Sequence, residues 1–428
     1  MAKTYGTYKD SGSVWVGDIP SEWNIGNFRY FGEFTKGKLP STSNTEGIGL
    51  PIIGASEMLG KECRTFSEDA NVPQCSNDDI LILWDGANAG IISSHHKGIV
   101  SSTAVKYHCL NSDVDKNFLY YFLKSVEPNF KEKVNGTTIP HMNIKYINEI
   151  PLLMPPLSVQ QSISSFLDTK CGEIDSLISI QEEMISELLA YKQSVITEAV
   201  TKGLDKKAKM KNSGVEWIGD IPEEWSFTKL KNIINYIESG VSVNAGLEEV
   251  SHKDIGVLKT SCVSKNKFLA NECKKVFETE LSRVACPVKA NTIIVSRMNT
   301  PELVGACGYV DHDYNNIFLP DRLWQVHFLN TAFVKFVYYS LISKRTKSYF
   351  SSLSSGTSSS MQNISQPQFQ NTIIALPPLP VQQAIATYLD EKTTQIDSLI
   401  ALKQSKIESL KEYKKSIIYE YVTGKKRV

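Results

Sequence analysis

Two long stretches of the chain carry hydrophobic residues in alternating steps of three and four, the spacing of an apolar stripe along a helix. They run from Pro155 to Lys202 and from Pro377 to Gly424, and about half of their positions match in an ungapped alignment. Each stretch predicts one long helix, roughly 65 Å in length at about 1.5 Å per residue. The stripe residues that we assign to the two helices are Ile163, Leu167, Ile174, Leu177, Leu188, Ile385, Leu389, Ile396, Leu399 and Leu410.

An apolar stripe needs a partner surface, and this chain carries two equivalent stripes. We therefore expect the two helices to pair with each other as an antiparallel coiled coil. Such a stripe also suits dimerisation between chains, but intramolecular pairing is the simpler interpretation because one chain already supplies both strands.

A second repeated element is a short irregular connector. Residues 11–23 read SGSVWVGDIPSEW, and residues 213–225 read SGVEWIGDIPEEW. Pro, Gly and Asp disfavour a helix here, and four of the six tryptophans of the chain lie in these two copies. We expect these tryptophans to anchor the connectors by packing.

The blocks that follow the connectors resemble each other much less than the connectors and helices do. Short runs rich in Ile, Val, Leu and Tyr, separated by Gly and Asn turns, predict strands in both blocks. The fold class is therefore α+β, with two globular domains, two long helices and a pseudo-twofold internal repeat. The predicted boundaries are 1–23 for the first connector, 24–153 for the first domain, 154–203 for the central helix, 204–225 for the second connector, 226–375 for the second domain and 376–428 for the last helix.

Composition and charge exclude few classes of function. The 46 basic and 46 acidic residues cancel, which neither requires nor excludes a nucleic-acid partner. No apolar run approaches the length of a membrane span, and we expect a cytoplasmic protein. The eight cysteines are scattered without a CxxC pair, so we expect packing residues and no metal site.

The repeated motifs resemble the specificity subunits of type I restriction-modification systems. The PPLxxQQxIxxxLD helix starts, the IDSLI segments and the WxGDIPxxW connectors carry this resemblance across nearly the whole chain. The resemblance is looser inside the blocks. The block segments that contribute to it are Gly37–Thr42, Asp79–Ile82, Gly86 and Gly90 in the first block, and Gly240–Ser242, Gly256–Ser261 and Thr292–Arg297 in the second.

This resemblance implies a DNA-reading subunit without an active site of its own. Each block would be a target-recognition domain for one half of a bipartite, asymmetric site in double-stranded DNA, and the helices would set the gap between the halves. Two methyltransferase subunits would dock on the helices, and restriction and translocase subunits would complete the complex. No cofactor is expected in this chain, and S-adenosylmethionine would be bound by the methyltransferase subunits.

Two other classes of function stay open at this point. One is a self-contained DNA methyltransferase or nuclease, although the chain lacks an NPPY or DPPY tetrapeptide, a GxxxxGK[ST] loop and an HExxH motif. The other is a coiled-coil interaction scaffold that does not bind DNA.

Candidate DNA contacts are loop residues of two kinds, the Lys and Arg that bind phosphates and the polar side chains that reach base edges. His95 and His96 also suggest a metal, but no second cluster supplies further ligands. We predict no catalytic residue. The predicted DNA contacts are Lys36, Lys38, Ser41, Thr42, Ser43, His95, His96, Lys97, Thr137, Thr138 and His141 in the first block, and Lys259, Thr260, Ser261, Lys265, Lys267, Arg297, Asn299, Arg322, Ser358, Ser359 and Gln362 in the second.

Overall fold

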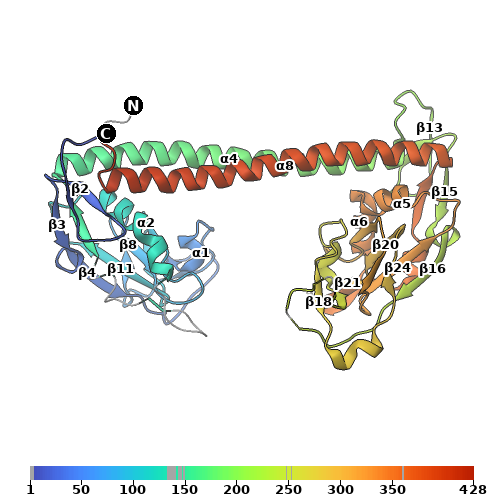
Figure 1. The fold of residues 1–428 in the computed structure, drawn as a ribbon, viewed down its shortest axis with the longest axis horizontal. Coiled ribbons are helices and arrows are strands. Elements are labelled where there is room, and N and C mark those ends of the chain that lie inside the picture. The colour runs from blue at the N-terminus through green and yellow to red at the C-terminus, as the bar shows by residue number, and fades with distance from the viewer. Residues whose placement is uncertain are drawn as a thin grey trace. The chain divides into compact units, whose positions relative to one another are not determined.

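The computed structural model divides the chain into two compact units (Figure 1). It describes residues 4–132, 141–142, 147, 150–246, 248–251, 253–358 and 361–428. Unit 1 comprises Met1–Glu182 with Gln404–Val428, and unit 2 comprises Glu183–Lys403. Each unit therefore contains one globular α+β domain, which we call domain 1 and domain 2, together with part of each long helix.

The two long helices pair in opposite directions within each unit. They are α4 (Leu157–Lys202, 46 residues) and α8 (Leu379–Val422, 44 residues). In unit 1 the start of α4 packs against the end of α8, where Ile163 and Ile417 belong to one buried cluster. In unit 2 the end of α4 packs against the start of α8, where Ile196 and Ile385 share another. This pairing is the expected antiparallel coiled coil.

The helix seam differs from the predicted stripe at two positions. Leu177 and Leu399 were assigned to the seam, but their side chains are 45% and 48% exposed. The next residues, Ile178 and Ile400, are the partly buried ones. From the buried Ile174, the heptad steps by four to Ile178, so the leucine of each IDSLI segment points outward. The stripe residues that are fully buried are Ile163, Leu167, Ile174, Ile385, Leu389 and Ile396, and Leu188 and Leu410 are partly buried.

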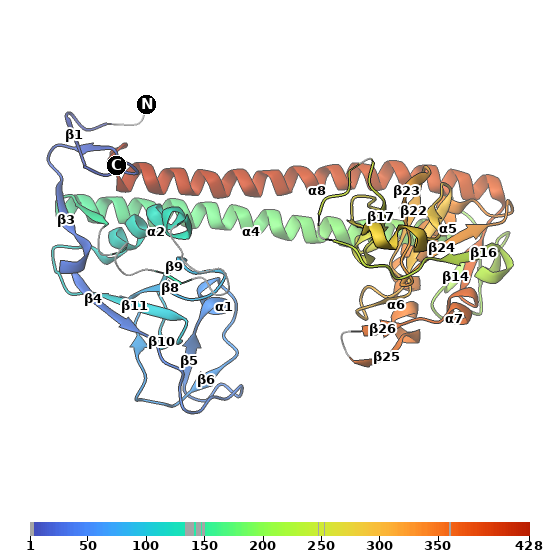
Figure 2. The same ribbon diagram turned by 60° about the horizontal axis from the view of Figure 1, so that its bottom comes forward.

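Domain 1 is built on two four-stranded sheets, and Figure 2 labels most of their strands. The first sheet has the order β4-β11-β8-β9 and is antiparallel throughout. The second has the order β6-β5-β10-β7. Phe118 and Phe122 of α2 belong to the same buried cluster as strand residues of the first sheet and the start of α4. The elements of domain 1 are β3 (Asn24–Asn27), β4 (Gly32–Lys36), β5 (Leu50–Ile53), α1 (Ala55–Met58), β6 (Phe66–Ser67), β7 (Gln74–Cys75), β8 (Ile80–Leu83), β9 (Ile92–Ser94), β10 (Gly98–Val100), β11 (Ala104–Cys109), α2 (Lys116–Glu132) and β12 (Pro151–Met154).

Domain 2 repeats this architecture. Its main sheet has the order β16-β24-β20-β22, which matches the first sheet of domain 1 strand for strand, and a second sheet has the order β18-β17-β23-β19. An additional three-stranded sheet, β21-β26-β25, lies in this domain. The elements are β15 (Ser226–Lys229), β16 (Ile234–Ser239), β17 (Gly256–Leu258), β18 (Cys273–Lys275), β19 (Pro287–Val288), β20 (Thr292–Ser296), β21 (Met298–Asn299), β22 (Cys307–Val310), β23 (Tyr314–Phe318), β24 (Leu323–Phe328), α5 (Val334–Ile342), α6 (Lys344–Leu353), β25 (Ser355–Ser358), β26 (Met361–Asn363), α7 (Gln366–Gln370) and β27 (Ile373–Leu376).

One glutamine of each PPLxxQQ motif ties its domain to its helix. Gln160 donates to the Pro155 carbonyl at 2.8 Å and accepts from the Asp115 backbone N–H at 2.8 Å. In unit 2 the equivalent Gln382 donates to the Pro377 carbonyl at 2.8 Å and accepts from a backbone N–H of domain 2 at 2.8 Å. Both glutamines are buried, so these bonds satisfy polar groups that water does not reach. The glutamine of each PPLxxQQ motif therefore anchors a domain to its long helix.

An aspartate at the end of each motif adds a second anchor. Tyr121 of domain 1 donates to Asp168 at 2.8 Å, and Tyr339 of domain 2 donates to Asp390 at 2.7 Å. Burial raises the pKa of Tyr339, which keeps its hydroxyl protonated as the donor. In domain 2, Lys335 also pairs with Asp390 at 2.6 Å. Each domain is thus held on its helix by the same glutamine contacts and the same tyrosine–aspartate bond.

The connectors pack against the ends of the long helices. Each forms a two-stranded hairpin, β1 (Tyr8–Asp10) with β2 (Asp18–Pro20) or β13 (Met210–Asn212) with β14 (Asp220–Pro222). Trp23 and Trp225 are buried. The other connector tryptophans pack on aromatic rings of the domains, as Trp217 does on Tyr349 with 3.9 Å between the ring centroids. The packing role expected for the connector tryptophans is what the structure shows.

In unit 1 the connector and the helix end come from opposite ends of the chain. Tyr8 donates to the Gly424 carbonyl at 3.1 Å, and Tyr419 of α8 donates to the Trp15 carbonyl at 3.1 Å. Figures 1 and 2 mark both chain ends at this part of unit 1. The N-terminal connector therefore completes the C-terminal helix, just as residues 213–225 follow α4 in unit 2.

Candidate nucleic-acid interface

Two side chains of domain 1 meet at the carboxylate of a third. Lys36 at the end of β4 lies 2.6 Å from one carboxylate oxygen of Asp85, and His141 lies 2.6 Å from the other. The Lys36 ammonium is also 5.8 Å from the centre of the Trp84 ring. Lys36 and His141 were predicted DNA contacts from distant segments, and strand pairing brings them together around Asp85.

The Asp85 carboxylate is ionised and its charge is partly neutralised. Partial burial opposes ionisation, but the hydrogen bonds from Lys36 and His141 outweigh it and lower the pKa of Asp85. Lys36 and His141 remain about half exposed, with 46% and 57% of their side chains accessible. The cluster therefore presents polar groups of both signs to an incoming ligand.

The other predicted residues of domain 1 lie apart from this cluster. Lys38 is exposed and has no ion pair among the described residues. Ser41 donates its hydroxyl to Asp69 at 2.8 Å, and this bond helps the backbone N–H groups of Ser41 and Asn71 to lower the pKa of Asp69. Thr42 and Ser43 are exposed loop residues.

The two adjacent histidines differ in their surroundings. His95 is exposed, has a φ of 62° and contacts Ser94 at 2.8 Å. His96 contacts Ser93 at 2.6 Å, and burial lowers the pKa of its ring. Lys97 is exposed beside them. Over the described residues, no group of three His, Cys, Asp or Glu side chains could hold a metal ion.

In domain 2 one group of predicted residues also meets at a carboxylate. Lys259 lies 2.8 Å from Glu272, and the Ser261 hydroxyl donates to the same carboxylate at 2.6 Å. The side-chain hydrogen bonds from Lys259 and Ser261 lower the pKa of Glu272. Thr260 lies between the two residues in the chain, and Lys265 and Lys267 are exposed on the loop that follows.

A second group of predicted residues gathers on the small sheet of domain 2. Asn299 of β21 is paired in register with Gln362 of β26. The Arg297 backbone N–H donates to the Arg322 carbonyl at 3.2 Å, which brings the two arginines together. Arg322 is exposed, and the Nε of Arg297 is buried without a partner. The small sheet and the segment that leads into it therefore bring together four predicted residues from three separate parts of the chain.

Three predicted residues cannot be placed. Thr137, Thr138 and Ser359 lie outside the described residues, and Ser358 is described only as the last backbone position of β25.

Sequence reasoning missed the carboxylates that organise these groups. Asp85, Asp69 and Glu272 each hold a predicted Lys or Ser, but only cationic and neutral side chains were considered as DNA contacts. Asp85 directly follows a strand-like run and precedes a glycine, a position typical of a functional loop. This position in the sequence could have identified Asp85 as a candidate functional residue.

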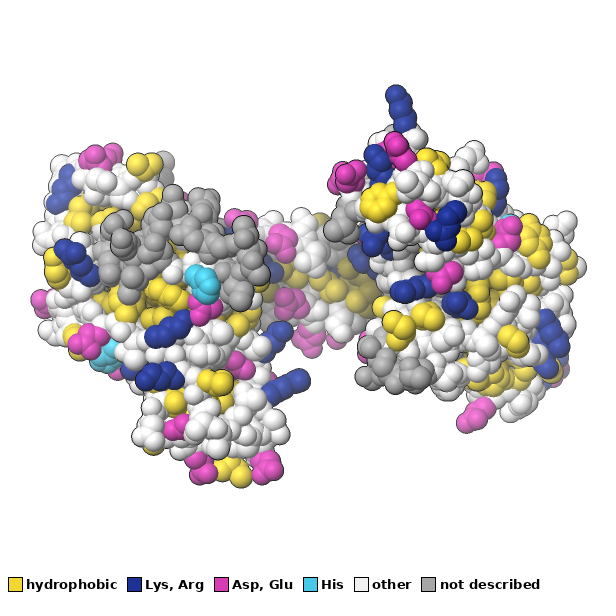
Figure 3. All heavy atoms as spheres, turned by 90° about the horizontal axis from the view of Figure 1, so that it is seen from below, with side chains coloured by type: hydrophobic (Ala, Val, Ile, Leu, Met, Phe, Trp, Pro, Cys, Tyr) yellow, Lys and Arg dark blue, Asp and Glu magenta, His cyan; other side chains and the backbone are white. Residues whose placement is uncertain are grey.

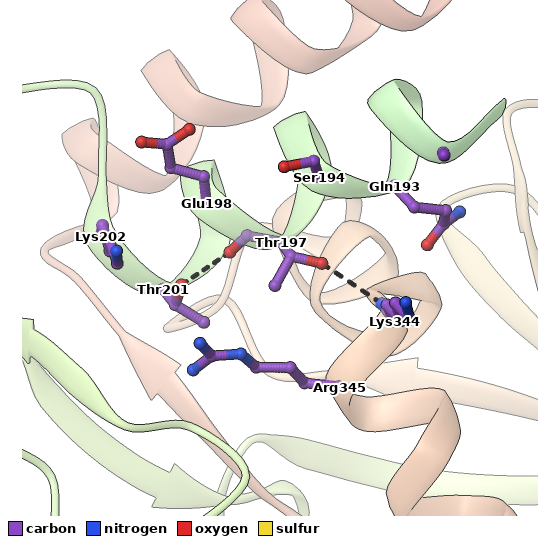
Figure 4. A pocket seen from close by; sticks show the side chains of 9 residues that line it. Gln193, Ser194, Thr197, Glu198, Thr201, Lys202, Lys344 and Arg345 are labelled. Carbon is purple, nitrogen blue, oxygen red and sulfur yellow. Dashed lines mark hydrogen bonds between the residues drawn. The ribbon is translucent and has the colours of Figure 1, made fainter. Parts of the chain in front are cut away.

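A hollow of about 460 Å³ lies in unit 2 between the end of α4 and the start of α6 (Figure 4). Lys202, Lys344 and Arg345 line it together with Glu198. The Thr197 hydroxyl accepts the Lys344 backbone N–H at 3.3 Å, and Arg345 donates to the Ile218 carbonyl of the connector. These contacts join domain 2, its connector and α4.

The charged surface of each unit is mixed. The face in Figure 3 carries Lys and Arg side chains interspersed with Asp and Glu on both domains. Such a surface fits selective contacts better than a strong, nonspecific attraction to polyanions.

Over the described residues, no helix is both long enough and apolar enough to span a membrane.

The family comparison matches both halves of the chain. The model of the type I restriction modification DNA specificity domain covers residues 20–189 and 222–412. The chain belongs to this family. Each match takes in one domain and most of the long helix that follows it, so the family unit coincides with the internal repeat.

Individual specificity subunits match large parts of the chain. The type I restriction enzyme MjaVIII specificity subunit of Methanocaldococcus jannaschii is 30% identical over 416 residues, which span 96% of this chain and 94% of the relative. The EcoBI specificity subunit of Escherichia coli is 23% identical over 64% of this chain and 59% of the relative. A chain in a solved type I R-M system assembly is 14% identical and covers 94% of this chain with a TM-score of 0.66, which shows a shared fold. The chain is thus a type I specificity subunit in sequence family and fold.

Proposed function

We propose that this chain is the non-catalytic DNA-recognition subunit of a type I restriction-modification complex. The observation that carries the proposal is that both domains share one strand order and one mode of anchoring, yet present different side chains at corresponding surface positions. Two copies of one scaffold with unlike surfaces suit the reading of two unlike DNA segments. Domain 1 and domain 2 each recognise one half of a bipartite, asymmetric site in double-stranded DNA, and the paired helices set the gap.

The exposed helix faces support two methyltransferase partners. Unit 1 exposes Leu177 and Ile180 on α4 and Tyr413 on α8. Leucines and a tyrosine at the equivalent repeat positions are exposed in unit 2. Large exposed apolar side chains on otherwise polar helices are typical of protein interfaces. The exposed residues of unit 2 are Leu399, Leu402 and Tyr191.

Because these apolar residues repeat, the same partner docks twice, once on each unit. The methyltransferase subunits bind S-adenosylmethionine and carry out methyl transfer, and restriction and translocase subunits join them in the full complex. This chain supplies no cofactor site. It acts in the cytoplasm, where it meets the DNA.

Selection from a random duplex DNA library tests the proposal. The complex of this chain with its methyltransferase subunit should enrich a motif made of two specified segments separated by unspecified base pairs. Exchange of domain 1 for the corresponding domain of another specificity subunit should change one segment only. An enriched motif with a single segment, or no enrichment at all, would overturn the proposal and favour a scaffold without a DNA role. Methyl transfer by the chain alone would show that it is an enzyme.

A further inference from the structure

In domain 1 the chain that leaves the central strand β8 is held by two backbone hydrogen bonds. Trp84, the first residue after β8, donates to the Thr103 carbonyl at 2.8 Å and accepts from the Met142 backbone N–H at 2.9 Å. The next residue, Asp85, forms an antiparallel bridge with His141. These bonds fix where the side chains of this segment emerge at the end of the sheet.

Domain 2 has the same backbone frame after β20, which takes the place of β8 in the strand order. Arg297, the first residue after β20, donates to the Arg322 carbonyl at 3.2 Å and accepts from the Ile364 backbone N–H at 3.0 Å. The next residue, Met298, is paired antiparallel with Asn363. We call this shared arrangement the strand-end frame.

The side chains of the strand-end frame differ completely between the domains. Elsewhere the repeat keeps its chemistry, as the anchoring glutamines Gln160 and Gln382 show. Two sites that read different DNA sequences need the same backbone with different side chains. The backbone frame then sets where the side chains lie, and the side chains determine which bases are bound. The corresponding residues are Trp84 and Arg297, Asp85 and Met298, Thr103 and Arg322, and His141 and Asn363.

Domain 2 presents one donor and one acceptor that lack partners. The Nε of Arg297 and the Oδ1 of Asn363 are buried without hydrogen bonds, and burial of such groups costs free energy until a ligand satisfies them. Within the described residues neither Arg297 nor Arg322 forms an ion pair. The planar donors of an arginine match the N7 and O6 acceptors of guanine in the major groove.

Domain 1 presents an acceptor at its strand-end frame. The Asp85 carboxylate is held by Lys36 and His141, and the Lys36 ammonium offsets its charge near a polyanion. Each carboxylate oxygen has a further lone pair, and a carboxylate in the major groove accepts from the N4 amino group of cytosine.

We propose that the strand-end frame is the base-reading site of each domain, with Arg297 and Arg322 reading guanine in one half-site and Asp85 accepting from cytosine in the other. This inference rests on the proposed function. It adds which residues choose the bases and assigns a G·C pair to each half-site.

The test compares the motifs selected by variants in complex with the methyltransferase subunit. Arg297→Lys keeps the positive charge but loses the two-donor fork, so it should relax the preference at one G·C pair of one half-site by about tenfold or more. Asp85→Ala should relax one G·C pair of the other half-site to a similar degree. Each variant should leave the remaining half-site unchanged.

Matched controls separate base reading from charge and folding. Arg283→Ala removes an exposed arginine of domain 2 that pairs with Glu280, and Asp78→Ala removes an aspartate of domain 1 that pairs with Lys116 as Asp85 pairs with Lys36. Both should select the wild-type motif, and melting curves should show that all variants fold.

The outcomes distinguish the two proposals. A wild-type complex that selects no bipartite motif overturns the proposed function. A wild-type complex that selects such a motif while Arg297→Lys and Asp85→Ala keep it unaltered overturns the base-reading site alone. If Arg297→Ala weakens binding equally on all sequences and Arg297→Lys restores it, Arg297 contacts phosphate and the inference fails.

Discussion

Lys414 of α8 donates to both carboxylate oxygens of Asp175 on α4, at 2.8 and 2.7 Å. Lys192 and Asp397 form the same pair in unit 2, at 2.7 and 2.8 Å. Each aspartate follows the first isoleucine of an IDSLI segment. A charged pair beside an apolar seam adds little stability but favours one alignment of the helices, because a shifted register separates the charges. The repeated IDSLI motif therefore contributes isoleucines to the buried seam and an aspartate that favours one register of the helices.

Charge reversal at this pair tests its contribution. Lys414→Glu places a carboxylate against Asp175 and should lower the free energy of unfolding by about 0.5 to 1 kcal/mol, a small effect because both side chains are partly exposed. Asp175→Lys combined with Lys414→Glu should recover most of that loss. Lys415→Glu on the neighbouring exposed position is the control and should change stability less. Urea unfolding measures the three variants against the wild type, and a double variant no more stable than Lys414→Glu would contradict the register role.

At the junction of the N-terminal connector with α8, we expect that a methyl group added at Gly424 destabilises the fold. Gly424 has a φ of 73°, and a Cβ there would collide with the Pro20 ring. Gly424→Ala should therefore lower the free energy of unfolding by about 1 to 3 kcal/mol. Gly203→Ala, with a φ of 76° and a Cβ 2.9 Å from Trp225, should behave alike.

Gly172 offers a matched control for both glycine variants. It lies inside α4, and a Cβ there would meet nothing within 4 Å. Gly172→Ala should stabilise the chain by up to about 1 kcal/mol. Thermal melting followed by circular dichroism checks the three, and a Gly424→Ala variant that melts with the wild type would show that the connector is not tightly docked.

Asp79 of domain 1 predicts a pH dependence of stability. Its carboxylate accepts from the Ser76 N–H at 2.7 Å and from His108 at 2.6 Å. Burial acts to raise the pKa of Asp79, but these hydrogen bonds outweigh it and lower the pKa. A lowered native pKa gives stability that is present above the unfolded value of about 3.9 and is lost as pH falls through the native value.

The Asp79→Asn variant tests this linkage. It should be less stable than the wild type at pH 6 by on the order of 1 kcal/mol, and the difference should shrink as the pH falls below about 4. Asp78→Asn changes the adjacent, largely exposed residue and is the control. Equal differences at pH 6 and pH 3 would show that ionised Asp79 does not contribute.

Most of the fold followed from the sequence because the repeat and the heptad are local patterns. The seam was misplaced at Leu177 and Leu399, since a short IDSLI segment fits two registers and only the neighbouring helix decides between them. The grouping of Lys36 with His141 could not be predicted. It depends on Asp85 and on strand pairing between segments that are far apart in the sequence.

The two exposed apolar sets on the helices predict a change in stoichiometry. Leu177→Glu together with Ile180→Glu places charges on unit 1 and leaves the equivalent residues of unit 2 intact. The complex should then bind one methyltransferase subunit instead of two, as measured by its mass in solution. Lys170→Glu on the same helix is the control and should keep both subunits. Loss of both subunits, or of neither, would contradict one docking site per unit.

The last prediction concerns the gap between the half-sites. Insertion of one heptad into α4 and one into α8, each between the residues where the two units meet, keeps the seam in phase. Seven residues lengthen each helix by about 10 Å, which corresponds to about three base pairs at roughly 3.4 Å each. The selected motif should keep both half-sites and gain about three unspecified base pairs. Insertion of four residues is the control, because it breaks the heptad phase and should impair folding or binding. An unchanged gap in the seven-residue variant would show that the helices do not set the spacing.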